Sequence, residues 1–99
     1  MQKDEADLAL SHALERLRKQ GYSAFRALAD CRTCSWALLT DKQAKRAVFT
    51  DDQDEKDWKE KGRCYLSWSG SGKTIIKALE AERLHASWTG KKTDRICVW

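Results

Sequence analysis

The residues with the clearest chemical potential are Cys31 and Cys34, which are separated by two residues. Two thiolates at this spacing can hold one metal ion from a tight turn, and zinc then requires two more ligands. The other side chains that could bind zinc are those of Cys64, Cys97 and two histidines, and the chain has no second Cys-x-x-Cys pair. The sequence therefore predicts no bound metal or cofactor, with Cys31 and Cys34 as the candidate ligands if one is present.

A redox dithiol is the second interpretation of the same pair. At the start of a helix, the first cysteine of a Cys-x-x-Cys motif has a lowered pKa. Arg32, between the two cysteines, would help to stabilise a thiolate. The simplest interpretation is that all four cysteines are structural or incidental, because a lone cysteine within a strand usually behaves as a small buried hydrophobe.

A glycine-rich stretch, residues 70–74, is the second candidate site. It reads Gly70, Ser71, Gly72, Lys73 and Thr74. Its end matches the phosphate-binding pattern GxxxxGK[ST], in which backbone N–H groups and the lysine hold phosphates. However, Ser67 occupies the position of the first glycine, and no later strand ends in an acidic residue that could hold magnesium. We expect a turn onto a helix N-terminus that binds a small anion weakly, and we assign no catalytic residue.

The composition describes one globular domain over residues 1–99. Hydrophobic residues make up 41% and charged residues 34% of the chain, and there is no proline. No segment approaches the 18 or so apolar residues of a membrane span, and the charged N-terminus lacks the apolar stretch of a signal peptide. We therefore expect a cytoplasmic protein with reduced cysteines and no membrane partner.

Charge is distributed unevenly along the chain. The net charge is +4, although residues 51–60 contain six acidic and only two basic side chains. The rest of the chain is basic, and its surface could bind nucleic acid or an acidic protein. Five tryptophans among basic residues would also suit base stacking. A small domain needs large apolar residues for its core, however, and we expect Trp36, Trp68 and Trp88 to be mostly packed inside.

The order of the elements predicts an α+β fold. Apolar periodicity and capping residues predict helices at 4–20, 35–44, 51–61 and 75–84, and strands at 22–29, 47–50, 63–69, 84–89 and 95–99. Strand–helix–strand crossovers make their strands parallel within one sheet, whereas the last two strands form an antiparallel hairpin. We expect a mixed four- or five-stranded sheet covered by helices.

Several features resemble an uncharacterised bacterial family, a domain of unknown function. They are Gly21-Tyr22, the Cys31–Cys34 turn, the acidic segment 48–54 with Gln53, the strand 64–68, Trp88-x-Gly90 and Arg95-Ile96-x-Val98. The similarity covers about residues 20–99. It implies the domain boundaries and carries no assigned activity.

The leading functional interpretation is a small binding domain, without enzymatic activity, that interacts with another protein. The alternative is an anion or nucleic-acid binder that uses the basic surface and residues 70–74. A thiol-dependent or zinc-binding protein acting through Cys31 and Cys34 is the third.

Overall fold

Five strands in residues 2–99, which the computed structural model describes, form one mixed sheet. They are β1 (Ser23–Phe25), β2 (Ala47–Phe49), β3 (Cys64–Trp68), β4 (Ala86–Ser87) and β5 (Ile96–Val98). Their order across the sheet is β1-β2-β3-β5-β4, with β1 and β2 parallel and every other neighbouring pair antiparallel. The predicted α+β class and the antiparallel terminal hairpin are confirmed.

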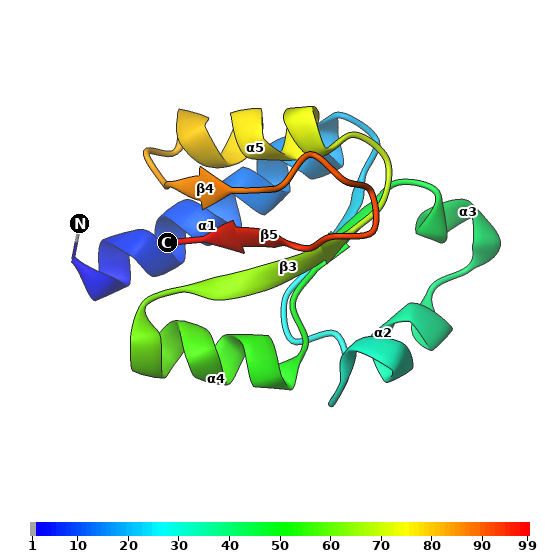
Figure 1. Cartoon of the computed structure of the whole chain (residues 1–99), viewed down its shortest axis with the longest axis horizontal. Helices are drawn as coiled ribbons and strands as arrows, with labels where there is room; N and C mark the ends of the chain where they lie inside the picture. The colour runs from blue at the N-terminus through cyan, green and yellow to red at the C-terminus, as the bar shows by residue number, and fades with distance from the viewer. Residues whose placement is uncertain (1) are drawn as a thin grey trace.

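Five helices in the same part of the chain accompany the sheet (Figure 1). They are α1 (Lys3–Lys19), α2 (Arg32–Leu38), α3 (Asp41–Ala44), α4 (Asp52–Lys61) and α5 (Gly72–Ala81). Helices α1 and α5 pack against each other, and α4 lies along β3. The Cα radius of gyration of 12.2 Å is close to the value of about 13 Å for a single domain of this length.

One face of the sheet forms the main hydrophobic core. The apolar stripe of α1, with Leu10, Leu14 and Leu17 at helical spacing, is fully buried there. The sheet contributes alternate residues, such as Leu66 and its cross-strand partner Ile96. Burial of these side chains provides the main driving force for folding.

The opposite face of the sheet is only partly covered. Phe49 and Ser67 are paired across β2 and β3 and lie on this face. Trp36 of α2 packs edge-on against Phe49, with ring centroids 4.9 Å apart. Farther along β3, Tyr65 is 51% exposed. Helix α2 therefore covers one end of this face and leaves a groove beside β3 and β5.

The expected parallel pairing across the α4 connection is wrong, because β2 and β3 are antiparallel. Only Thr50 and Asp51 separate β2 from α4, and Asp51 caps the helix at once. The chain reverses instead at Gly62, which ends α4 with a left-handed φ of +70°. Because the reversal lies between α4 and β3, the second strand returns antiparallel to the first.

The single helix expected at 35–44 is also wrong. The segment forms two short helices, α2 and α3, and Leu39 between them has an extended backbone. Thr40 starts α3 with a capping box, in which its hydroxyl accepts the Gln43 N–H and the Gln43 side chain accepts the Thr40 N–H. Helix α2 begins at Arg32, three residues earlier than expected, and this places both cysteines at its start.

Trp68 is buried, as expected. Trp36 and Trp88 were also expected to be mostly packed inside, and they are partly buried. Within residues 2–99, no helix has both the length and the apolar character needed to span a membrane.

Candidate functional site

The loops that follow β1 and β2 meet at one edge of the sheet. Because these strands are parallel, their carboxyl ends lie side by side, which is where open α/β sheets commonly place ligands. The Leu28 N–H donates to the Thr50 carbonyl at 3.0 Å, and the Asp52 N–H donates to the Ala29 carbonyl at 2.9 Å. These bonds hold the loop from β1 to α2 against the start of α4.

Ion pairs fix the base of this loop. The Arg26 guanidinium binds both oxygens of Glu55, at 3.0 and 2.6 Å, and the Asp7 carboxylate at 2.7 Å. The hydrogen bond from Arg26 lowers the pKa of Asp7. The Thr50 hydroxyl accepts the Ala27 N–H at 2.9 Å and donates to Glu55. Ala27 has a positive φ of 51°, an unusual conformation for a residue with a side chain.

Cys31 and Cys34 lie at the end of this loop, and both are exposed. Cys31 is the N-cap of α2, and its sulfur accepts the backbone N–H of Cys34 at 3.2 Å. The two sulfur atoms are 2.8 Å apart. The structure thus brings the two candidate residues together as a vicinal dithiol on the surface, with the first cysteine at the helix start.

The two thiols differ in acidity. The pKa of Cys31 is lowered, because the Cys34 thiol and the Cys34 backbone N–H both donate hydrogen bonds to its sulfur. The pKa of Cys34 is raised, first by its hydrogen bond to Cys31 and then by the negative charge there. At a pH between the two values, Cys31 carries the charge and Cys34 keeps its proton.

Carboxylates surround the dithiol. Asp51 and Asp30 oppose ionisation of Cys31 and Cys34, respectively. Asp52 is close enough to Asp30 for a hydrogen bond between the carboxyl groups, and this contact raises the pKa of Asp52. The acidic segment was evident in the sequence, but its position beside the cysteines was not. Its position directly after a strand is the signal that could have done so.

The other two cysteines differ from Cys31 and Cys34 in burial and in acidity. Cys64 is buried in the core, and burial raises the pKa of its thiol to about 12. Cys97 is partly buried on β5, and burial also raises its pKa. Throughout residues 2–99, no group of three or more histidine, cysteine, aspartate or glutamate side chains is arranged to hold a metal ion. In this part of the chain, no further side chains are therefore placed to complete a metal site with Cys31 and Cys34.

The glycine-rich stretch forms the predicted turn onto a helix. Ser71 is the N-cap of α5, and its hydroxyl oxygen accepts the Thr74 N–H at 3.2 Å. The Ser71 N–H donates to the Tyr22 hydroxyl at 2.8 Å. A Cβ on Gly70 would lie 2.8 Å from the Tyr22 oxygen, and one on Gly72 would lie 2.7 Å from the Trp88 ring. Both glycines thus have a packing role, and anion binding at residues 70–74 stays a prediction.

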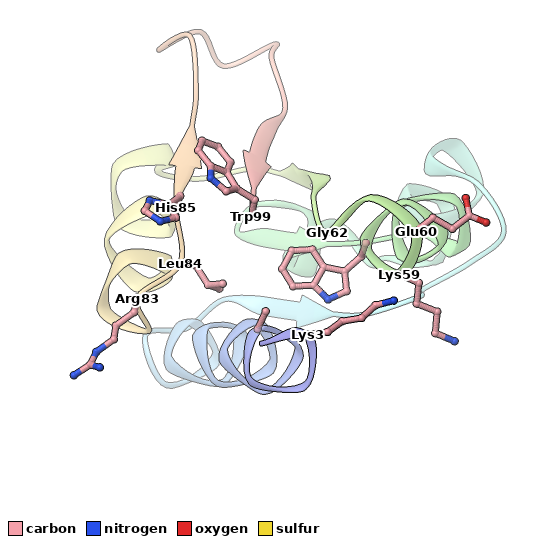
Figure 2. A pocket seen from close by; sticks show the side chains of 10 residues that line it. Lys3, Lys59, Glu60, Gly62, Arg83, Leu84, His85 and Trp99 are labelled. Atoms are coloured by element: carbon pink, nitrogen blue, oxygen red, sulfur yellow. The ribbon is translucent and has the colours of Figure 1, made fainter. Parts of the chain in front are cut away.

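One cavity, with a volume of about 700 Å³, lies between the ends of α1, α4 and β5. Figure 2 shows Trp99 beside His85 on one side of it and Lys59 with Glu60 on the other. The rings of His85 and Trp99 stack with centroids 5.5 Å apart, and Trp99 is 45% exposed. Its basic and aromatic walls contain no paired nucleophile and base, so this groove offers a binding surface and no evident reaction chemistry.

Comparison with known proteins identifies a family for this chain but no activity. A family model described as "Domain of unknown function (DUF6891)" matches residues 4–99. No curated protein and no solved structure matches the chain.

Proposed function

Since the chain belongs to the family of the domain of unknown function DUF6891, whose description assigns no activity, we propose a function from its own geometry: Cys31 and Cys34 form a thiol–disulfide exchange site. The observation that carries the proposal is the 2.8 Å separation of their two exposed sulfur atoms. The lowered pKa of Cys31 supports it, since the thiolate is the attacking form of a cysteine.

The reaction begins with Cys31. Its thiolate attacks one sulfur of a partner disulfide, so that a Cys31–partner S–S bond forms while the partner's own S–S bond breaks. The first partner thiolate leaves and takes a proton from solvent. Cys34 then loses its proton and attacks the Cys31 sulfur, which releases the second partner thiolate. The protein dithiol ends as a disulfide, and the partner disulfide ends as two thiols.

The different acidities of the two thiols suit this order. While Cys31 is a thiolate, its hydrogen bond and its charge keep Cys34 protonated. When Cys31 enters the mixed disulfide, it loses that charge, so the main causes of the raised Cys34 pKa disappear. Cys34 then ionises more readily, at the stage at which it must attack.

The partner we propose is a protein disulfide, in keeping with the interpretation of the chain as a protein-binding domain. Leu38 is the specific observation in favour, because it ends the short helix that Cys31 caps, lies four residues after Cys34 and is 62% exposed. An exposed apolar side chain one helical turn from Cys34 can contact a partner chain. We also propose that this is a bacterial, cytoplasmic protein, and such a compartment keeps cysteine thiols reduced.

The test is equilibration of the folded protein in mixtures of a small thiol and its disulfide, followed by acid quenching, alkylation and mass mapping. We expect one reversible transition, in which Cys31 and Cys34 lose alkylation together by forming an internal disulfide. Single Cys31→Ser and Cys34→Ser variants should lose this transition, whereas Cys97→Ser should keep it. Persistence of both free thiols under the most oxidising mixture would reject the proposal.

A further inference from the structure

Two exposed carboxylates stand beside the dithiol. Asp30 directly precedes Cys31 in the chain. Asp52 is held next to it, because the Asp52 N–H donates to the Ala29 carbonyl at 2.9 Å. The side chains of Asp30 and Asp52 are both exposed, as are the two thiols. Any molecule that reaches the sulfur atoms therefore passes close to these two carboxylates.

The negative charge at this place is not neutralised by bound cations. On the first turns of α4, the Glu55 carboxylate is bound by Arg26 at 2.6 Å. Within residues 2–99, by contrast, no ion pair involves Asp30, Asp51 or Asp52. Their charges remain available to attract or repel an approaching charged group.

The cation closest to the cysteines in sequence is Arg32, which lies between them. It lines a small pocket together with Trp36 and Asp94, on the half-covered face of the sheet. In the described part of the chain, it forms no ion pair with either of the exposed aspartates. The one positive charge of Arg32 is smaller than the summed charge of three aspartates, so the surroundings of the dithiol are negative.

These carboxylates are near enough to act on the sulfur atoms. Hydrogen bonds from Cys34 lower the pKa of Cys31, and the charge of Asp51 opposes this effect. The pKa of Cys34 is raised first by its hydrogen bond to Cys31 and by the charge there, and to a smaller extent by the charge of Asp30. A charge that is felt by the sulfur atoms is also felt by a charged disulfide in contact with them.

We propose that Cys31 and Cys34 select disulfides that are flanked by cationic groups, so that the partner segment carries lysine or arginine side chains next to its disulfide. This selection rests on the proposed exchange function and adds a role for Asp30 and Asp52, which attract cationic partners and repel anionic ones. The sign of the preference is informative, because the whole chain has a net charge of +4 and would by itself favour an anion.

The test compares three small disulfides in a Cys97→Ser background: cystamine is cationic, hydroxyethyl disulfide is neutral and dithiodipropionate is anionic. Attack by the Cys31 thiolate forms a mixed disulfide and releases half of the reagent as a thiol, and closure by Cys34 releases the other half. Each rate is divided by the rate of the same reagent with a blocked cysteine peptide, which removes differences in intrinsic reactivity. At low ionic strength, we expect the corrected rate to be about tenfold higher for cystamine than for dithiodipropionate, with the neutral reagent between them.

Variants assign the selection to individual carboxylates. Asp30→Asn and Asp52→Asn should each reduce the ratio of the cystamine rate to the dithiodipropionate rate about threefold, and Asp30→Lys should bring it to about one or below. Arg32→Gln should raise the ratio, because it removes a nearby cation. Glu80→Gln is the matched control, since it removes an exposed carboxylate from α5, which packs into the core on the other face of the sheet, and it should leave the ratio unchanged.

Two peptides extend the test to a polypeptide partner. They have the same length and one disulfide each, and the cysteines are flanked by lysines in one peptide and by glutamates in the other. The lysine peptide should oxidise the protein faster. The difference should vanish at about 1 M sodium chloride, where the Debye length is only about 3 Å.

The possible failures are distinguishable. Equal corrected rates for the three small disulfides, or a faster anionic reagent, would overturn the charge selection and leave the exchange function in place. An equal effect of Asp30→Asn and Glu80→Gln would also overturn it, because overall charge would then be the cause. If none of the reagents, including the neutral one, formed a mixed disulfide at Cys31, the exchange site itself would be rejected, and the selection with it.

Discussion

The Cys31 sulfur accepts the backbone N–H of Cys34 at 3.2 Å, so one side chain is both the cap of α2 and the proposed nucleophile. A helix start leaves backbone N–H groups without partners, and a thiolate that accepts one is stabilised in return. The reactivity of the dithiol and the stability of this seven-residue helix are therefore linked.

The first prediction tests the capping role. Cys31→Ala should lower the melting temperature by about 5 °C, because alanine cannot accept the Cys34 N–H. Cys31→Ser is the matched control and should keep or raise the melting temperature, since serine is a preferred N-cap. Thermal unfolding followed by circular dichroism measures both. Equal melting temperatures for the two variants would show that the hydrogen bond does not support α2.

The second prediction concerns pH. Because the pKa of Cys31 is lowered, its thiolate should persist below the ordinary thiol pKa, and alkylation should slow only as the pH falls through that lower value. In Cys34→Ala the thiol donor is lost, so the midpoint of the pH profile should move up. Alkylation rates at Cys31, resolved by mass mapping, provide the measurement. A midpoint in the wild-type protein at or above about 8.5 would contradict the lowered pKa.

The third prediction tests the base of the loop. Arg26→Ala should reduce the free energy of unfolding by about 2 kcal/mol, because Glu55 and Asp7 lose a shared, partly buried partner. Urea unfolding provides the value. The control is Arg16→Ala, which removes a more exposed pair with Glu82 and should cost clearly less. The network would have no special structural role if the two variants were equally stable.

The fourth prediction concerns the glycine-rich turn. Gly72→Ala should reduce the free energy of unfolding by about 2 kcal/mol, because its Cβ would lie 2.7 Å from the Trp88 ring. Gly62→Ala meets no atom within 4 Å and should cost about 1 kcal/mol through its left-handed φ alone. Urea unfolding of both variants separates a steric cost from a conformational one. A harmless Gly72→Ala would mean that Trp88 can move aside.

Local sequence signals predicted much of the fold. The apolar stripe of α1 is present as its spacing predicts. Local residue types predicted a cap at Thr50 or Asp51 and another at Ser69 or Ser71, and the structure places them at Asp51 and Ser71. Prediction failed where the path of the chain depends on distant packing. The direction of β3 was wrong because it depends on where the reversal at Gly62 falls relative to α4.

The candidate site was only half visible in the sequence. The spacing of Cys31 and Cys34 was evident, but the start of α2 was expected three residues too late, so the cap was missed. Cysteine is not a usual N-cap residue, and this explains the error. The small pocket lined by Arg32, Ser67 and Arg95 was not predicted, because its lining comes from segments that only the folded sheet brings together.

The most direct measurement is a rapid reaction of the reduced protein with excess dipyridyl disulfide, in a Cys97→Ser background so that the partly buried thiol does not contribute. We predict fast release of both halves of the reagent, the first on attack by Cys31 and the second on closure by Cys34. In Cys34→Ser the second release should vanish, and a stable mixed disulfide at Cys31 should be trapped. Slow, independent labelling of Cys31 and Cys34, with no internal disulfide formed, would contradict it.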